Sequence, residues 1–238
     1  MQTTIDIYHE RIDEIELYFN ALKELYQTQS RETGNSFYND DFLKILKANA
    51  LIMIYNLVES SIMGGVMEIY EELKSNGYSY KDVRKEIQDI WFSFKFNQVY
   101  DKTAHYNSYR DKASEIISAI MQNKPIEMDR KATDISGNLD ATKIRQICNE
   151  HGITYTIDST CRGGVVLEDV KNKRNELAHG TTSFAECGRD YAIEDLEKIK
   201  NETIIFLKGI LEGMKQYYDE RKYCSFSVLN CNMKLNTF

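Results

Sequence analysis

Three polar side chains come together at one end of an expected helix. Residues 165–179 contain no Pro or internal Gly, and Gly180 follows at the position where a left-handed residue commonly ends a helix. Asn175 and His179 are four residues apart and therefore share a face, next to Arg174. An imidazole can transfer protons and a guanidinium can stabilise negative charge, so this helix end carries the groups needed for acid–base chemistry on an anion.

Arg174 also occupies a position where the helical pattern requires an apolar side chain. The pattern has steps of three and four residues, through Leu167, Val170, Arg174 and Leu177. The longest expected helix, residues 40–74, has one charge, Glu59, in an apolar seam with steps of three and four residues. The seam consists of Ile45, Ala48, Ile52, Tyr55, Glu59, Ile62, Val66, Ile69 and Leu73. An unpaired carboxylate among apolar neighbours costs several kcal/mol. We therefore expect a two-pronged contact between Arg174 and Glu59.

Long helices predict the fold class. One Pro in 238 residues, and Glu, Lys, Leu and Ile in uninterrupted runs, indicate an all-α protein. Four long helical segments with steps of three and four residues predict a four-helix bundle. Shorter helices are expected between the second and third of these. The expected helices are residues 3–27, 40–74, 80–96, 109–121, 140–151, 165–179 and 192–223.

The chain reads as one domain over residues 1–238, because no linker rich in Gly, Ser or Pro divides it. We expect residues 97–164 to form a helical insertion and residues 181–190 to form a loop. The tail, residues 224–238, is expected to be disordered or to lie on a partner.

Composition limits the function. The start of the chain has no signal-peptide pattern and no stretch of about 18 uncharged apolar residues occurs, so we expect a cytoplasmic protein with no membrane partner. Five scattered cysteines predict neither disulfides nor a zinc site, and no metal or cofactor is expected. The pair Cys148 and His151 has ligand spacing but too few ligands. A formal net charge of -7 means that any contact with RNA must be local.

One further segment could accept a phosphate. Arg162-Gly163-Gly164 places a glycine pair just before the helix at 165–179, where backbone amides can bind anions. No G-x-G-x-x-G or G-K-[ST] motif accompanies the pair, so a nucleotide-binding loop is not expected.

The segment Arg174-Asn175-Glu176-Leu177-Ala178-His179 resembles the R-x-x-x-x-H signature of the HEPN superfamily. Its place before the last long helix matches that family, and the resemblance extends from the first helix to about Tyr223. Further similarities to one stand-alone prokaryotic branch are Ser136-Gly137-Asn138-Leu139-Asp140, His151-Gly152-Ile153 and Ala178-His179-Gly180 with Ser183-Phe184.

The resemblance implies a metal-independent RNase that is active as a homodimer, often the toxin of a toxin–antitoxin or phage-defence system. By the same resemblance, Arg174, Asn175 and His179 take the catalytic positions and Glu59 matches a polar position on the second helix. A neutralising antitoxin or defence-system protein is then an expected partner. Some members are silenced by nucleotide transfer to a tyrosine two residues after the histidine, where this chain has Thr181.

RNA cleavage without a metal requires these residue types. A base must take the 2′-OH proton, an acid must protonate the leaving 5′-oxygen, and a cation must stabilise the charge on phosphorus. One imidazole cannot be base and acid at once, so a second chain is the expected source of a second His179. Asn175 is expected to hold the histidine tautomer or a phosphate oxygen, and Glu59 to orient Arg174.

Two other interpretations remain open. In the first, the chain is a catalytically silent HEPN module that binds a nucleotide or a protein through the same pocket. In the second, Arg174 and Glu59 are only a buried ion pair that fixes the packing of two helices.

Overall fold

The computed structural model describes residues 1–31, 40–97, 106–133, 135 and 137–225. Over these residues the chain forms eight α-helices and two short 3-10 helices, and its extended pairings are two isolated bridges. The expected all-α fold is confirmed.

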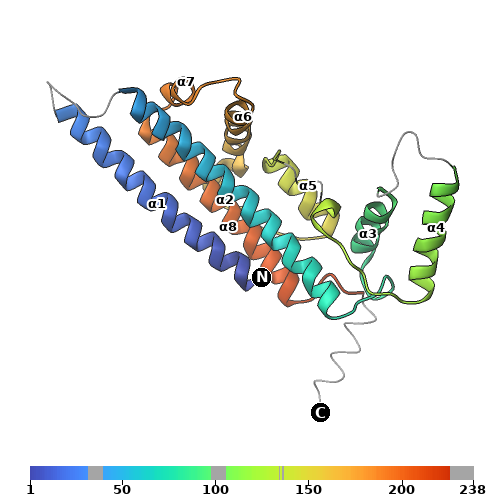
Figure 1. Cartoon of the computed structure of the whole chain (residues 1–238). Helices are drawn as coiled ribbons and strands as arrows, with labels where there is room; N and C mark the ends of the chain where they lie inside the picture. Colours follow the sequence, from blue (N-terminus) through green and yellow to red (C-terminus); the bar gives the residue numbers. More distant parts are fainter. Residues whose placement is uncertain (32–39, 98–105, 134, 136, 226–238) are drawn as a thin grey trace, which may run out of the picture.

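Three long helices form the body of the molecule. They are α1 (Gln2–Arg31), α2 (Asp40–Ser75) and α8 (Ile193–Asp219). Figure 1 shows them side by side, with α1 running opposite to α2 and α8. The shorter α6 (Val166–His179) packs against both α2 and α8 and is the fourth helix of the bundle.

The seam of α2 forms much of the core, as its spacing predicted. Tyr55, Ile62, Val66 and Ile69 are buried, whereas Glu59 in the middle of the seam is partly exposed. By length and composition α2 could cross a membrane, with a mean hydropathy of 1.5 in its most apolar window. More than half of that window is buried inside the bundle, as in the core helix of a helical domain.

The segment between α2 and α6 lies to one side of the bundle. It contains α3 (Lys85–Asn97), α4 (Tyr106–Met121) and α5 (Ala141–His151). Figure 1 shows α3 and α4 standing away from the long helices, with α5 between them and α6. The 3-10 helices η1 (Arg130–Ala132) and η2 (Ser159–Gly164) flank α5 in sequence.

The expectation for the segment before α8 was wrong. Residues 181–190 are not merely a loop, because they contain the short helix α7 (Phe184–Arg189), which packs against α2. Ser183 and Glu186 form a capping box: the Ser183 hydroxyl accepts from the Glu186 amide, and the Glu186 carboxylate accepts from the Ser183 amide. The expected tail starts too early, because Cys224 is buried and forms a bridge with Val83. Residues 226–238 lie outside the described part of the chain.

Candidate functional site

The end of α6 is built as its sequence predicted. Leu167, Val170 and Leu177 are buried and hold the helix against the bundle. Gly180 has a left-handed conformation (φ 69°), and its amide donates to carbonyls of the last turn, which ends the helix there. His179 therefore sits on the final turn with its side chain exposed.

His179 faces a shallow, open pocket of about 410 Å³. Asn175 and Thr181 line the pocket with it, together with Asn172 and Glu176. The imidazole makes no hydrogen bond with any other residue that the structure describes. Both of its nitrogens are therefore available to a ligand that enters the pocket.

Arg174 lies beside this pocket rather than in its lining, and three groups hold its guanidinium. Nη1 donates to the Gly137 carbonyl at 3.3 Å and to the Asn175 side-chain oxygen at 3.0 Å. The Cζ atom lies 4.6 Å from the centroid of the Tyr55 ring, a cation–π contact. The arginine is thus fixed on one side, and 27 % of its side chain remains exposed.

Asn175 joins the arginine to the pocket. Its Oδ1 accepts from Arg174, and its Nδ2 donates to Asn138 Oδ1 at 3.0 Å. Of the two roles expected for Asn175, holding the histidine tautomer has no contact among the described residues, and holding a phosphate oxygen stays a prediction. The two Asn175 bonds instead fix the orientation of the amide between Arg174 and the pocket.

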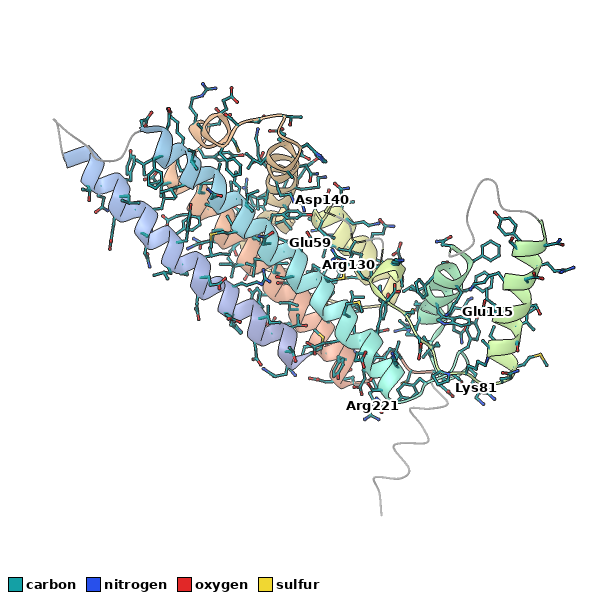
Figure 2. All side chains as sticks on the ribbon, viewed as in Figure 1. Glu59, Lys81, Glu115, Arg130, Asp140 and Arg221 are labelled. Carbon is teal, nitrogen blue, oxygen red and sulfur yellow. The ribbon has the colours of Figure 1, made fainter. Side chains whose placement is uncertain are left out.

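The pairing of Arg174 with Glu59 differs from the expected one. The contact between Arg174 Nη2 and Glu59 Oε2 measures 3.7 Å, which is longer than a hydrogen bond, so the expected two-pronged hydrogen bonding is not formed. The closer partner of Glu59 is Arg130 on η1, whose Nη2 donates to Oε1 at 2.9 Å. Figure 2 shows Arg130 beside Glu59. The Glu59 side chain is 22 % exposed, so the pair is not deeply buried.

A second ion pair ties the loop before α5 to α6. Asp140 caps α5 by accepting from the Lys143 amide, and its other oxygen lies 2.6 Å from Lys171 Nζ. Burial alone raises the pKa of Asp140, but the bonds from Lys171 and the Lys143 amide outweigh burial and lower it. Loop residues Gly137 and Asn138 are thereby held against Arg174 and Asn175.

Sequence reasoning missed four residues of this cluster, which are Tyr55, Arg130, Gly137 and Asn138. Tyr55 had a signal, because it lies one helical turn before Glu59 on the same seam. Gly137 and Asn138 stood in the turn that carried part of the family resemblance. Arg130 had no signal, because it lies outside every periodic segment and meets Glu59 across 71 positions.

Burial of Tyr55 has an electrostatic consequence. Burial raises the pKa of its hydroxyl, which accepts a hydrogen bond from the Leu139 amide at 3.2 Å. The hydroxyl is neutral at physiological pH even at its ordinary pKa of 10, and the face of the ring attracts the Arg174 cation through its quadrupole.

The other segments considered in the sequence have structural partners. His151 is buried, with Nε2 2.8 Å from the Tyr70 hydroxyl and Nδ1 2.7 Å from the Ile147 carbonyl oxygen. Arg162 donates from Nε to Oε1 and from Nη2 to Oε2 of the buried Glu202, at 3.1 and 3.0 Å. Among the described residues no group of three or more His, Cys, Asp or Glu is arranged to hold a metal.

Comparison with known proteins identifies the family. The family model described as HEPN_MAE_28990-like HEPN matches residues 2–223, nearly the whole chain. No curated protein and no solved structure matches the chain significantly. The matched region contains the four bundle helices and the whole Arg174–His179 segment. The chain therefore belongs to the HEPN superfamily.

Proposed function

We propose that the protein is a metal-independent endoribonuclease whose site is built from Arg174, Asn175, His179 and Glu59. The observation that carries the proposal is the exposed His179 imidazole at the mouth of an open pocket. Its neighbour Asn175 is oriented by an arginine that retains donors for an anion. This arrangement suits the handling of one proton next to one phosphate.

The reaction follows from these groups. A base takes the proton of the ribose 2′-OH, and the 2′-oxygen attacks phosphorus. Arg174 stabilises the negative charge that develops on the phosphate oxygens. The bond from phosphorus to the 5′-oxygen breaks, and an acid supplies the proton to that oxygen. The products are a 2′,3′-cyclic phosphate and a 5′-hydroxyl.

A homodimer would supply the base and the acid from two copies of His179. His151 cannot serve as the second group, because it is buried and bonded on both nitrogens. With a shared site, dimers that contain one wild-type chain and one His179→Ala chain are inactive. Activity should then fall with the square of the wild-type fraction when the two chains are co-expressed, and a linear fall would indicate one site per chain.

The cellular role proposed is that of a cytoplasmic toxin or effector in a toxin–antitoxin or phage-defence system, held in check by a partner protein. Expression of wild type and of His179→Ala in a bacterial host tests this role. We expect growth arrest and fragmentation of total RNA in the wild type alone. Normal growth and intact RNA with both proteins would contradict an unrestrained toxin.

One observation favours a second candidate function. The formal net charge of -7 is unusual for a protein that binds many phosphates of a nucleic acid. A silent HEPN module that binds a nucleotide or a protein in the same pocket is compatible with that charge. Calorimetry with mononucleotides separates the two, because binding without turnover supports the module and cleavage supports the nuclease.

A further inference from the structure

Glu59 is shared by two arginines in an unequal way. Each carboxylate oxygen faces a different guanidinium: Oε1 is 2.9 Å from Arg130 Nη2, and Oε2 is 3.7 Å from Arg174 Nη2. The first contact is a charge-assisted hydrogen bond, whereas the second is longer than one. Glu59 is therefore bonded to Arg130 and only near Arg174.

The longer distance to Glu59 determines which N–H donors of Arg174 remain available to a substrate. Its Nη1 is committed to Gly137 and Asn175, so Nη2, with Nε beside it, is the side of the guanidinium that remains for an incoming phosphate. A carboxylate prefers to bind both prongs of a guanidinium. A Glu59 released from Arg130 would be free to close on Nη2 and occupy the donor that a phosphate requires.

We propose that Arg130 is a positioning residue, which holds the Glu59 carboxylate away from Arg174 and so keeps Nη2 available to an RNA phosphate. The inference rests on the proposed function of the site and adds a residue from the insertion between α2 and α6. Arg130 acts through Glu59 and not on the RNA itself.

Arg130 lies on the surface, so its replacement should not disturb the packing of the core. Its side chain is 62 % exposed on the short η1, so its removal leaves no cavity in the core. Arg110 is a matched control: its side chain is also 62 % exposed and lies 3.0 Å from a carboxylate, that of Asp111. Arg110 lies on α4, which Figure 1 shows on the far side of α5 from α6.

The experiment is a double-mutant cycle with Arg130→Ala and Glu59→Gln. Cleavable RNA gives kcat and KM, and anisotropy with a 2′-O-methyl RNA of the same sequence gives affinity without cleavage. In chains that keep Glu59, we expect Arg130→Ala to raise KM by about 10-fold and to weaken RNA binding by the same factor. The value of kcat should change by less than about 3-fold. In the Glu59→Gln background the same change should have an effect below about 2-fold, because the neutral amide that replaces the carboxylate has no charge to restrain.

Two further variants complete the test. Arg130→Lys keeps a cation on Glu59 and should restore affinity to within about 3-fold of wild type. Arg110→Ala should match wild type in both assays. Rescue by Arg130→Lys together with the loss of effect in Glu59→Gln supports positioning.

Other outcomes overturn the inference. An equal loss of RNA affinity from Arg130→Ala with Glu59 and with Glu59→Gln would show that Arg130 contacts the RNA directly. No loss of affinity in either case would show that Arg130 has no role in RNA binding. If the protein binds the 2′-O-methyl RNA but does not cleave RNA, the proposed nuclease function is wrong. The double-mutant cycle then still tests the role of Arg130 through binding affinity. Absence of both binding and cleavage would overturn the function and this inference together.

Discussion

The Arg174 guanidinium lies over the ring of Tyr55, with Cζ 4.6 Å from the ring centroid. Tyr55 is buried in the seam of α2, so the bundle core supports the arginine from beneath. The ring, and not the hydroxyl, makes this contact. Tyr55→Phe keeps the ring and loses the hydroxyl, whereas Tyr55→Leu loses both. The two variants therefore test whether the ring supports Arg174.

Tyr55→Phe should keep activity within about 3-fold, because it keeps the ring, whereas Tyr55→Leu should lower kcat/KM by about 5- to 10-fold, the usual worth of a cation–π contact. Tyr55→Phe should still lose about 1 kcal/mol of stability with the hydrogen bond from Leu139. Initial rates and urea unfolding of the two variants measure this. Equal activity of Tyr55→Leu and wild type would show that the ring contact is unimportant.

Gly137 is a position where a single methyl group should disturb Arg174. Its φ is 65°, and an added Cβ would lie 2.8 Å from Arg174 Nη1. Gly137→Ala should therefore displace the guanidinium and lower the cleavage rate by about 10-fold, by the usual cost of misplacing a catalytic group.

Gly77 provides the matched control for this change. It has nearly the same backbone angle, φ 66°, and nothing lies within 4 Å of its added Cβ. Gly77→Ala carries the same backbone strain, about 1 kcal/mol, without the clash. Comparable losses of activity in both variants would attribute the effect to strain and not to Arg174.

Arg174→Ala distinguishes a site arginine from a purely structural one. Arg174 and Glu59 are 27 % and 22 % exposed and lie 3.7 Å apart, so their pairing should contribute no more than about 1 kcal/mol to stability. We expect activity to fall by about 100-fold or more and the urea midpoint to change little. A loss of several kcal/mol in the unfolding free energy would instead favour the ion pair as a packing device.

Acid should destabilise the protein through His151. Burial lowers the pKa of this imidazole below its ordinary value of 6.5, because the charged form is disfavoured among Tyr70, Tyr217 and the backbone of α5. The unfolded chain takes up the proton near pH 6.5 while the native chain does not. Stability is therefore retained above that pH and falls as the pH decreases below it, by up to about 1.4 kcal/mol per pH unit.

Urea unfolding of wild type and His151→Gln at about pH 7.5 and about pH 5.5 measures this dependence. The wild type should lose about 1 kcal/mol more than the variant between the two pH values. His9→Gln, which changes an exposed histidine, should behave as wild type does. Identical pH dependence in wild type and His151→Gln would contradict the prediction.

Much of the fold was predictable because local signals agreed with it. Gly180 adopts a left-handed conformation at the end of α6, as its position indicated. Asp140 and the left-handed Gly152 lie at the two ends of α5, in agreement with the helix expected over residues 140–151. The helix α7 was missed although Ser183 and Glu186 carry the spacing of a capping box. A helix of six residues has too short a pattern to stand out from a loop.

The candidate site could be predicted where residues broke a pattern or shared a helix face, as Asn175 and His179 do. Arg174 and Glu59 were found because each puts a charge into an apolar stripe. Arg130 breaks no pattern, since it lies in a segment without periodicity and meets Glu59 only after the chain has folded. The shorter distance from Glu59 to Arg130 and the longer distance to Arg174 likewise depend on three-dimensional packing and not on local sequence.

The initial rates of RNA cleavage by purified wild type, His179→Ala and His9→Ala in the presence of EDTA test most directly whether His179 takes part in RNA cleavage, as proposed. The His9 variant, prepared in the same way, controls for contaminating RNases. We predict that wild type and His9→Ala cleave equally, that His179→Ala is slower by about 100- to 10,000-fold, and that the products end in 2′,3′-cyclic phosphates. Equal rates for His179→Ala and wild type, or no cleavage by any of the three proteins, would contradict the account.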